Sequence, residues 1–167
     1  MKKLMYLLII GILAVMITGC GMSESEKKQD AEKWDKVASI TEMEIRNGFQ
    51  EYVNVIKEIK EQDDKISPTQ KESYKKRLED IEKKQNGIAD LIDSDFEIDS
   101  DNDSYEAKKV QEKADKLKEI ASKIADASAD LSDIIEDSSE KMSKKDSADI
   151  METLKEIAED FKSLDKK

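Results

Sequence analysis

The sequence predicts an all-α protein that folds as an antiparallel up-down bundle of four helices. The 167 residues include only five Gly and one Pro, whereas charged residues make up 41% and hydrophobic residues 37% of the chain. This composition is typical of long helices and argues against turn-rich β folds. In addition, four stretches carry apolar residues at alternating spacings of three and four, which is the period of an amphipathic helix.

The first helix is predicted to begin between Ser23 and Asp30, because Ser23 and Glu26 have the spacing of a capping box. The pair Asn47-Gly48 interrupts its apolar stripe, and three outcomes are open there: the helix bends, splits, or lets a neighbouring helix approach closely. The stripe itself consists of Trp34, Ala38, Ile45, Phe49, Tyr52, Ile56 and Ile59.

The second helix has the clearest start signal of the chain. Ser67 can cap it, Pro68 occupies the first helical position, and Gln70 can complete a capping box. The apolar pattern ends at a strongly acidic segment, residues 93–103, which we expect to connect two helices. The stripe before that segment consists of Tyr74, Leu78, Ile81, Gln85, Ile88 and Ile92.

The third helix is predicted from Ser104 to Asp137, and a polar connection over residues 138–145 leads to the fourth. Many of the third helix's apolar positions are Ala, which permits close helix packing. Its stripe consists of Ala107, Val110, Ala114, Leu117, Ala121, Ile124, Ser128, Leu131 and Ile135. The stripe of the fourth helix consists of Ile150, Leu154, Ile157, Phe161 and Leu164.

Four amphipathic helices with short links must bury their stripes against one another, and the short links favour antiparallel neighbours. We therefore expect one helical-bundle domain over residues 31–167. The fourth helix is shorter than the third. A three-helix, spectrin-like core with a short C-terminal helix attached is therefore the alternative.

The first twenty residues have the character of an export signal. Lys2 and Lys3 provide a positive start, and the run from Leu4 to Ile17 holds 14 residues without a charge. This run suits the apolar core of a signal peptide and is short for a bilayer-spanning helix, which needs about 20 apolar residues. The segment Ile17-Thr18-Gly19-Cys20 follows, and Cys20 is the only cysteine of the chain.

This tetrad resembles the lipobox of bacterial lipoproteins. The resemblance implies a signal peptide over residues 1–19, transfer of a diacylglyceryl group to the Cys20 sulfur, and cleavage before Cys20. It also implies attachment to the extracytoplasmic face of the cell membrane through that lipid. We expect residues 20–30 to form the lipidated cysteine and a polar tether. The excess of Lys over Arg, 27 to 2, favours a Gram-positive envelope.

Composition excludes several functions. The absence of His removes Ser-His and Cys-His nucleophile pairs and His-ligated zinc, and a single Cys forms no internal disulfide. The net charge of −11 becomes −13 without Lys2 and Lys3, so the domain repels polyanions such as nucleic acids. We expect no enzyme activity, no catalytic residue and no cofactor.

The acidic segment 93–103 is the candidate cation site. Counted from Asp95, its carboxylates partly follow the pattern of an EF-hand loop, but Ser100 stands where the sharp turn requires Gly. We therefore expect no metal site, and instead a solvated connection in which Asp103 or Ser104 caps the third helix. Phe96 and Ile98 are expected to cover the end of the bundle.

Two further groups have a functional and a structural interpretation. The aromatic residues Trp34, Tyr52 and Tyr74 can line a ligand groove, but each lies on an apolar stripe, which favours a place in the core. The basic residues around Arg77 can contact anionic headgroups, but they also match acidic neighbours, which we take as their main role.

Three functions remain open for a lipid-anchored domain of this kind. The first is binding of an unknown protein partner, or tethering, at the cell surface. The second is a structural or wall-associated spacer that self-associates as a homo-oligomer, which the heptads of the third helix favour. The third is a small-ligand or cation binder, which a pocket larger than about 300 Å³ would support.

Overall fold

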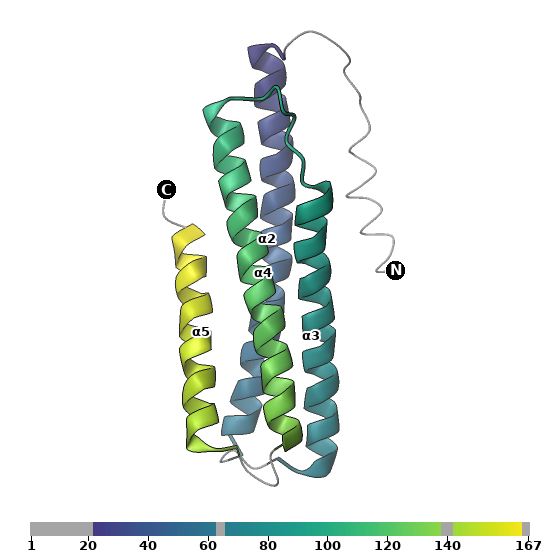
Figure 1. The fold of residues 1–167 in the computed structure, drawn as a ribbon, viewed down its shortest axis with the longest axis vertical. Helices are drawn as coiled ribbons and strands as arrows, with labels where there is room; N and C mark the ends of the chain where they lie inside the picture. Colours follow the sequence, from purple (N-terminus) through teal and green to yellow (C-terminus); the bar gives the residue numbers. More distant parts are fainter. Residues whose placement is uncertain (1–21, 63–65, 138–141, 165–167) are drawn as a thin grey trace.

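The computed structural model describes residues 22–62, 66–137 and 142–164, and it confirms the predicted all-α fold. Four helices form the bundle: α2 (Glu24–Lys60), α3 (Pro68–Asp95), α4 (Tyr105–Asp137) and α5 (Lys144–Leu164). Helices that follow each other in sequence run in opposite directions (Figure 1). Among the described residues, no helix has both the length and the apolar character that a bilayer span requires.

The first two helices begin where their capping boxes predict. The Ser23 hydroxyl accepts a hydrogen bond from the backbone N–H of Glu26, and the Glu26 carboxylate accepts one from the Ser23 N–H at 2.7 Å. Ser67 and Gln70 form the same reciprocal pair, with a Ser67 N to Gln70 Oε1 distance of 2.9 Å and Pro68 at the first helical position. These bonds satisfy backbone donors that a helix N-terminus otherwise leaves unpaired.

Serine also begins the last two helices. The Ser104 hydroxyl accepts a hydrogen bond from the Ala107 N–H at 3.1 Å, so Ser104 rather than Asp103 caps α4. The Ser143 hydroxyl accepts from the Asp146 N–H at 3.1 Å, and the Asp146 carboxylate accepts from the Ser143 N–H. The start of each helix is therefore fixed by local sequence chemistry.

The tether predicted for residues 20–30 is shorter than expected, because α2 already begins at Glu24. Its first turns are not free of the bundle. The Lys27 ammonium lies 2.5 Å from the Asp103 carboxylate, which precedes α4. The capping box and this long-range contact therefore hold residues 24–30 of the predicted tether in helical form.

The helices share one hydrophobic core. Buried residues from all four helices belong to a single cluster, and those of α5 are Ile150, Ile157 and Phe161. Phe161 reaches α2, where its ring lies 5.5 Å from that of Phe49. The fourth helix is therefore part of the bundle and not an appendage to a three-helix core. It covers only part of the length of α4 (Figure 1).

Helix α2 runs unbroken through Asn47-Gly48, so the close-approach outcome is the one observed. The fully buried side chain of Gln85 from α3 lies against Gly48, and a Cβ atom at position 48 would come within 2.8 Å of the Gln85 Cδ. Neither amide atom of Gln85 has a hydrogen-bond partner among the described residues. The absence of a side chain at Gly48 thus makes room for a polar residue in the core.

We predict that the effect of Gly48→Ala on stability changes sign with residue 85. In the wild-type chain the added methyl group overlaps the enclosed Gln85 amide, and the free energy of unfolding falls by about 1–3 kcal/mol. In a Gln85→Ala background, Gly48→Ala raises it by about 1 kcal/mol through helix propensity. Urea unfolding followed by circular dichroism measures the change in the free energy of unfolding in both backgrounds.

Gly87 provides the matched control, because nothing lies within 4 Å of a Cβ placed there. Gly87→Ala should raise the free energy of unfolding by about 1 kcal/mol in both backgrounds. If Gly48→Ala stabilises the wild-type chain as much as Gly87→Ala does, the close contact between position 48 and Gln85 is contradicted.

Candidate functional site

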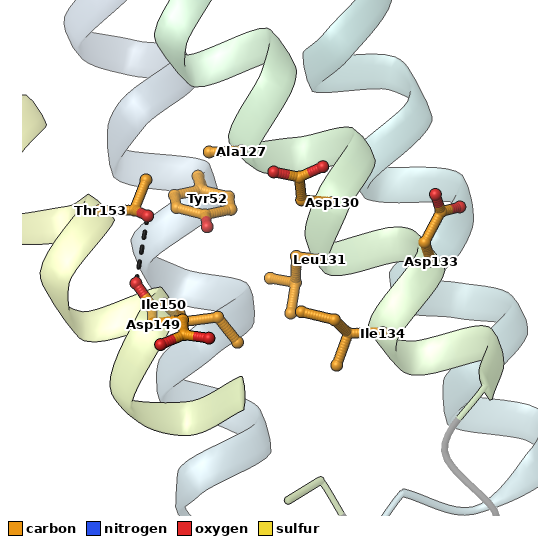
Figure 2. A pocket seen from close by; sticks show the side chains of 9 residues that line it. All are labelled: Tyr52, Ala127, Asp130, Leu131, Asp133, Ile134, Asp149, Ile150 and Thr153. Carbon is orange, nitrogen blue, oxygen red and sulfur yellow. Dashed lines mark hydrogen bonds between the residues drawn. The ribbon is translucent and has the colours of Figure 1, made fainter. Parts of the chain in front are cut away.

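A groove of about 350 Å³ opens between α4 and α5 and is floored by α2. Figure 2 shows that the side chains of α5 face those of α4 across it, with Tyr52 of α2 between and behind them. The volume exceeds the 300 Å³ at which small-ligand pockets begin. The lining residues are Tyr52, Ala127, Asp130, Leu131, Asp133, Ile134, Asp149, Ile150 and Thr153.

Tyr52 places a polar atom at the bottom of the groove. Its side chain is only 1% exposed and lies on the apolar stripe of α2, as the sequence predicts. In Figure 2 the hydroxyl nevertheless points into the groove, and it forms no hydrogen bond with any residue that the structure describes. A buried tyrosine hydroxyl usually has such a partner.

The pKa of Tyr52 is raised well above its usual value, first by burial and then by the negative charge of Asp130. The phenol therefore remains neutral throughout the physiological range. It can donate or accept a hydrogen bond, but it does not act as a base near neutral pH.

Three carboxylates form the rim of the groove. Asp130 and Asp133 come from α4 and Asp149 from α5 (Figure 2). All three are exposed, and none is in an ion pair within the described part of the chain. The lining holds no Lys or Arg, so the groove combines an apolar floor with an uncompensated negative rim.

Sequence reasoning did not single out these three carboxylates, although a signal for two of them is present. The last turns of α4, from Ile124 to Asp137, contain five acidic residues and no basic one. Acidic residues are unfavourable at a helix C-terminus, where the macrodipole is negative. Glu136 of this run pairs with Lys75 of α3, whereas Asp130 and Asp133 have no such partner among the described residues.

The acidic segment 93–103 is part helix and part loop. Helix α3 continues to Asp95, and the loop after it is fixed by the buried Asn102, which donates hydrogen bonds to the Lys27 carbonyl and the Asp30 carboxylate, each at 2.9 Å. Within the described ranges, no three His, Cys, Asp or Glu residues are placed to hold a metal ion.

The aromatic residues at the end of the bundle that holds the acidic segment pack as the sequence predicts. The ring centroids of Phe96 and Trp34 are 4.7 Å apart, so Phe96 covers the end of the α2 stripe. At the opposite end Tyr74 is buried, and its hydroxyl accepts a hydrogen bond from Gln62. Of the three aromatic candidates, Tyr52 is the one that lines this groove.

The basic residues of α3 balance acidic neighbours, as expected. The Arg77 guanidinium contacts both Glu58 oxygens, at 2.7 and 3.0 Å, and its Nε lies 2.8 Å from a Glu51 oxygen. The Lys75 ammonium lies 2.6 Å from the Glu136 carboxylate of α4. These side chains therefore link helices within the bundle.

Cys20, the predicted lipidation site, lies outside the described residues, as does the predicted signal peptide over residues 1–19. No family model matches the chain, and comparisons with curated proteins and with solved structures give no match either. What the protein does is therefore inferred from its own residues and their geometry.

We predict that Tyr52 makes the fold sensitive to high pH. Below about pH 10 the phenol is protonated in both the folded and the unfolded protein, so Tyr52 gives the free energy of unfolding no pH dependence there. Above it, only the unfolded phenol ionises, so wild-type stability falls by up to about 1.4 kcal/mol per pH unit more than that of Tyr52→Phe. Urea unfolding at pH 9 to 11 measures the difference between the two proteins.

Titration of lysines is common to both proteins and cancels in that difference. Tyr105→Phe is the matched control, since Tyr105 is 70% exposed. Parallel stability curves for wild type and Tyr52→Phe would contradict a buried, neutral phenol.

Proposed function

We propose that the protein is a lipid-anchored extracytoplasmic lipoprotein whose non-catalytic helical bundle binds a protein partner at the cell surface. The observation that carries this proposal is the short distance in sequence between the lipobox cysteine and the bundle. Cys20 precedes Ser23, the cap of α2, by only three residues. An extended link of this length spans at most about 11 Å.

Such a link places one end of the bundle next to the lipid headgroups. That end holds the start of α2 and the acidic connection before α4 (Figure 1). An acidic surface is repelled by anionic lipid, which favours a bundle that projects from the membrane. At about 1.5 Å per residue, α2 extends about 55 Å, so the opposite end is held well away from the bilayer.

The chemistry of the described residues supports binding more than catalysis. The chain has no His, and the groove's one buried polar group, Tyr52, is a neutral phenol with a raised pKa. The carboxylates around it are exposed, so they lack the enclosure that tunes a general acid or base.

The fold removes one argument for a self-associating spacer, which is the heptad pattern of α4. The apolar stripe of α4 is buried against the other helices of the same chain, so its heptads are not available to a second copy. Large apolar side chains remain exposed at only four described positions, which are Ile40, Met43, Tyr105 and Met151. Met151 lies on α5, in the half of the bundle away from the start of α2.

We predict that Cys20→Ala abolishes incorporation of a fatty-acid probe, because the thiol is the group that accepts the lipid. Metabolic labelling of growing cells, followed by purification of the protein, measures incorporation. Ser25→Ala is the matched control, because it alters an exposed residue beyond the lipobox and should label as the wild type does. Label retained in Cys20→Ala would refute the anchor.

A second experiment tests which end meets the partner. A photoreactive residue at Met151 should give a discrete protein adduct on intact cells, and one at the exposed Tyr105 should give none. The pair compares the far half of the bundle with the half next to the membrane. Equal adducts at both positions, or none at Met151, would contradict a partner bound away from the membrane.

A further inference from the structure

We propose that the groove between α4 and α5 binds a linear aliphatic polyamine cation. The inference stands on the described groove and does not depend on the lipid anchor. Three features of the groove point to this ligand class: an acidic rim without counter-charge, a groove-facing tyrosine hydroxyl with no hydrogen-bond partner among the described residues, and an apolar floor between them. In the protein alone, the carboxylates lack a counter-charge, the hydroxyl lacks a hydrogen-bond partner and the apolar floor lacks a covering group. An alkylammonium chain can supply all three.

The rim supplies the charge. Asp130 and Asp133 lie on one side and Asp149 on the other, and none of them is in an ion pair within the described ranges. Some carboxylates elsewhere in the bundle are paired, such as Asp160 with Lys123 at 2.7 Å, whereas no Lys or Arg lines the groove. The two rim residues of α4 also lie in its C-terminal third, and no basic residue follows Asp130 in the helix, so their charge is not balanced from α4 itself.

Tyr52 supplies a specific polar contact. Tyr52 is only 1% exposed, and its hydroxyl points into the groove, where it has no hydrogen-bond partner in the described part of the chain (Figure 2). An ammonium group has three donors and no acceptor. The neutral phenol oxygen can accept one of these hydrogen bonds while the rim carboxylates accept the others.

The floor determines the kind of cation. Leu131, Ile134 and Ile150 present apolar surface between the two acidic sides, and methylene groups between two ammonium groups can cover it (Figure 2). A compact metal ion does not fit this arrangement, because no three potential ligands in the described residues are placed to hold one. Anionic ligands are repelled by the rim. A linear polyamine satisfies both the charges and the apolar surface.

Isothermal titration calorimetry of the full chain in non-ionic detergent, with the linear triamine spermidine as the probe, tests the proposal. We expect one binding site in about 0.1 M salt, a concentration that screens diffuse surface attraction. Asp130→Asn and Asp149→Asn should each weaken binding roughly tenfold, since each removes a charged hydrogen-bond partner. Tyr52→Phe should weaken it roughly fivefold, since it removes only the hydroxyl.

Asp80→Asn is the matched control. It removes the same charge from an exposed position on α3, outside the groove, and should leave affinity within about twofold of wild type. Circular dichroism spectra confirm that each variant is folded. The proposal is overturned when spermidine gives no saturable binding, when Asp80→Asn weakens binding as much as Asp130→Asn, or when Mg²⁺ competes at equal concentration.

Discussion

The burial of α4 among the other three helices is the constraint on which the rest of the structure depends. Thirteen of its side chains are buried, and seven of these are Ala or Ser. Small side chains allow neighbouring backbones to come close, so a single helix can contact α2, α3 and α5. Its larger residues, such as Leu117, Ile124 and Leu131, fill the centre of the common core.

α5 is shorter than α4, and the groove lies between the two helices. α5 packs chiefly on α4 and reaches α2 through the contact of Phe161 with Phe49, so one side of α4 is covered over only part of its length. Between the two helices, Tyr52 from the stripe of α2 lines the bottom of the groove. Negative side chains gather there because the C-terminal part of α4 carries acids without bases.

Much of the fold could be predicted from local chemistry. The Ser23 and Ser67 boxes fixed two helix starts, and the stripes located the core, because caps and periodicity depend on nearby residues alone. Within the predicted range of Ser23 to Asp30, the helix starts at the early end, and a long-range contact between Lys27 and Asp103 holds its first turns. Choosing among the outcomes at Gly48 required knowing that Gln85 faces it. The groove at Tyr52 was equally hidden, because it depends on how α5 packs beside α4 and α2.

Hydrogen exchange along the intact chain tests the central role of α4 most directly. Amide protons exchange through local opening, so the helix enclosed by all the others should open last. The account predicts that the middle of α4, from Leu117 to Leu131, exchanges most slowly and that α5 exchanges earlier. Amides of α4 that exchange as fast as those of α5, or faster, would contradict it.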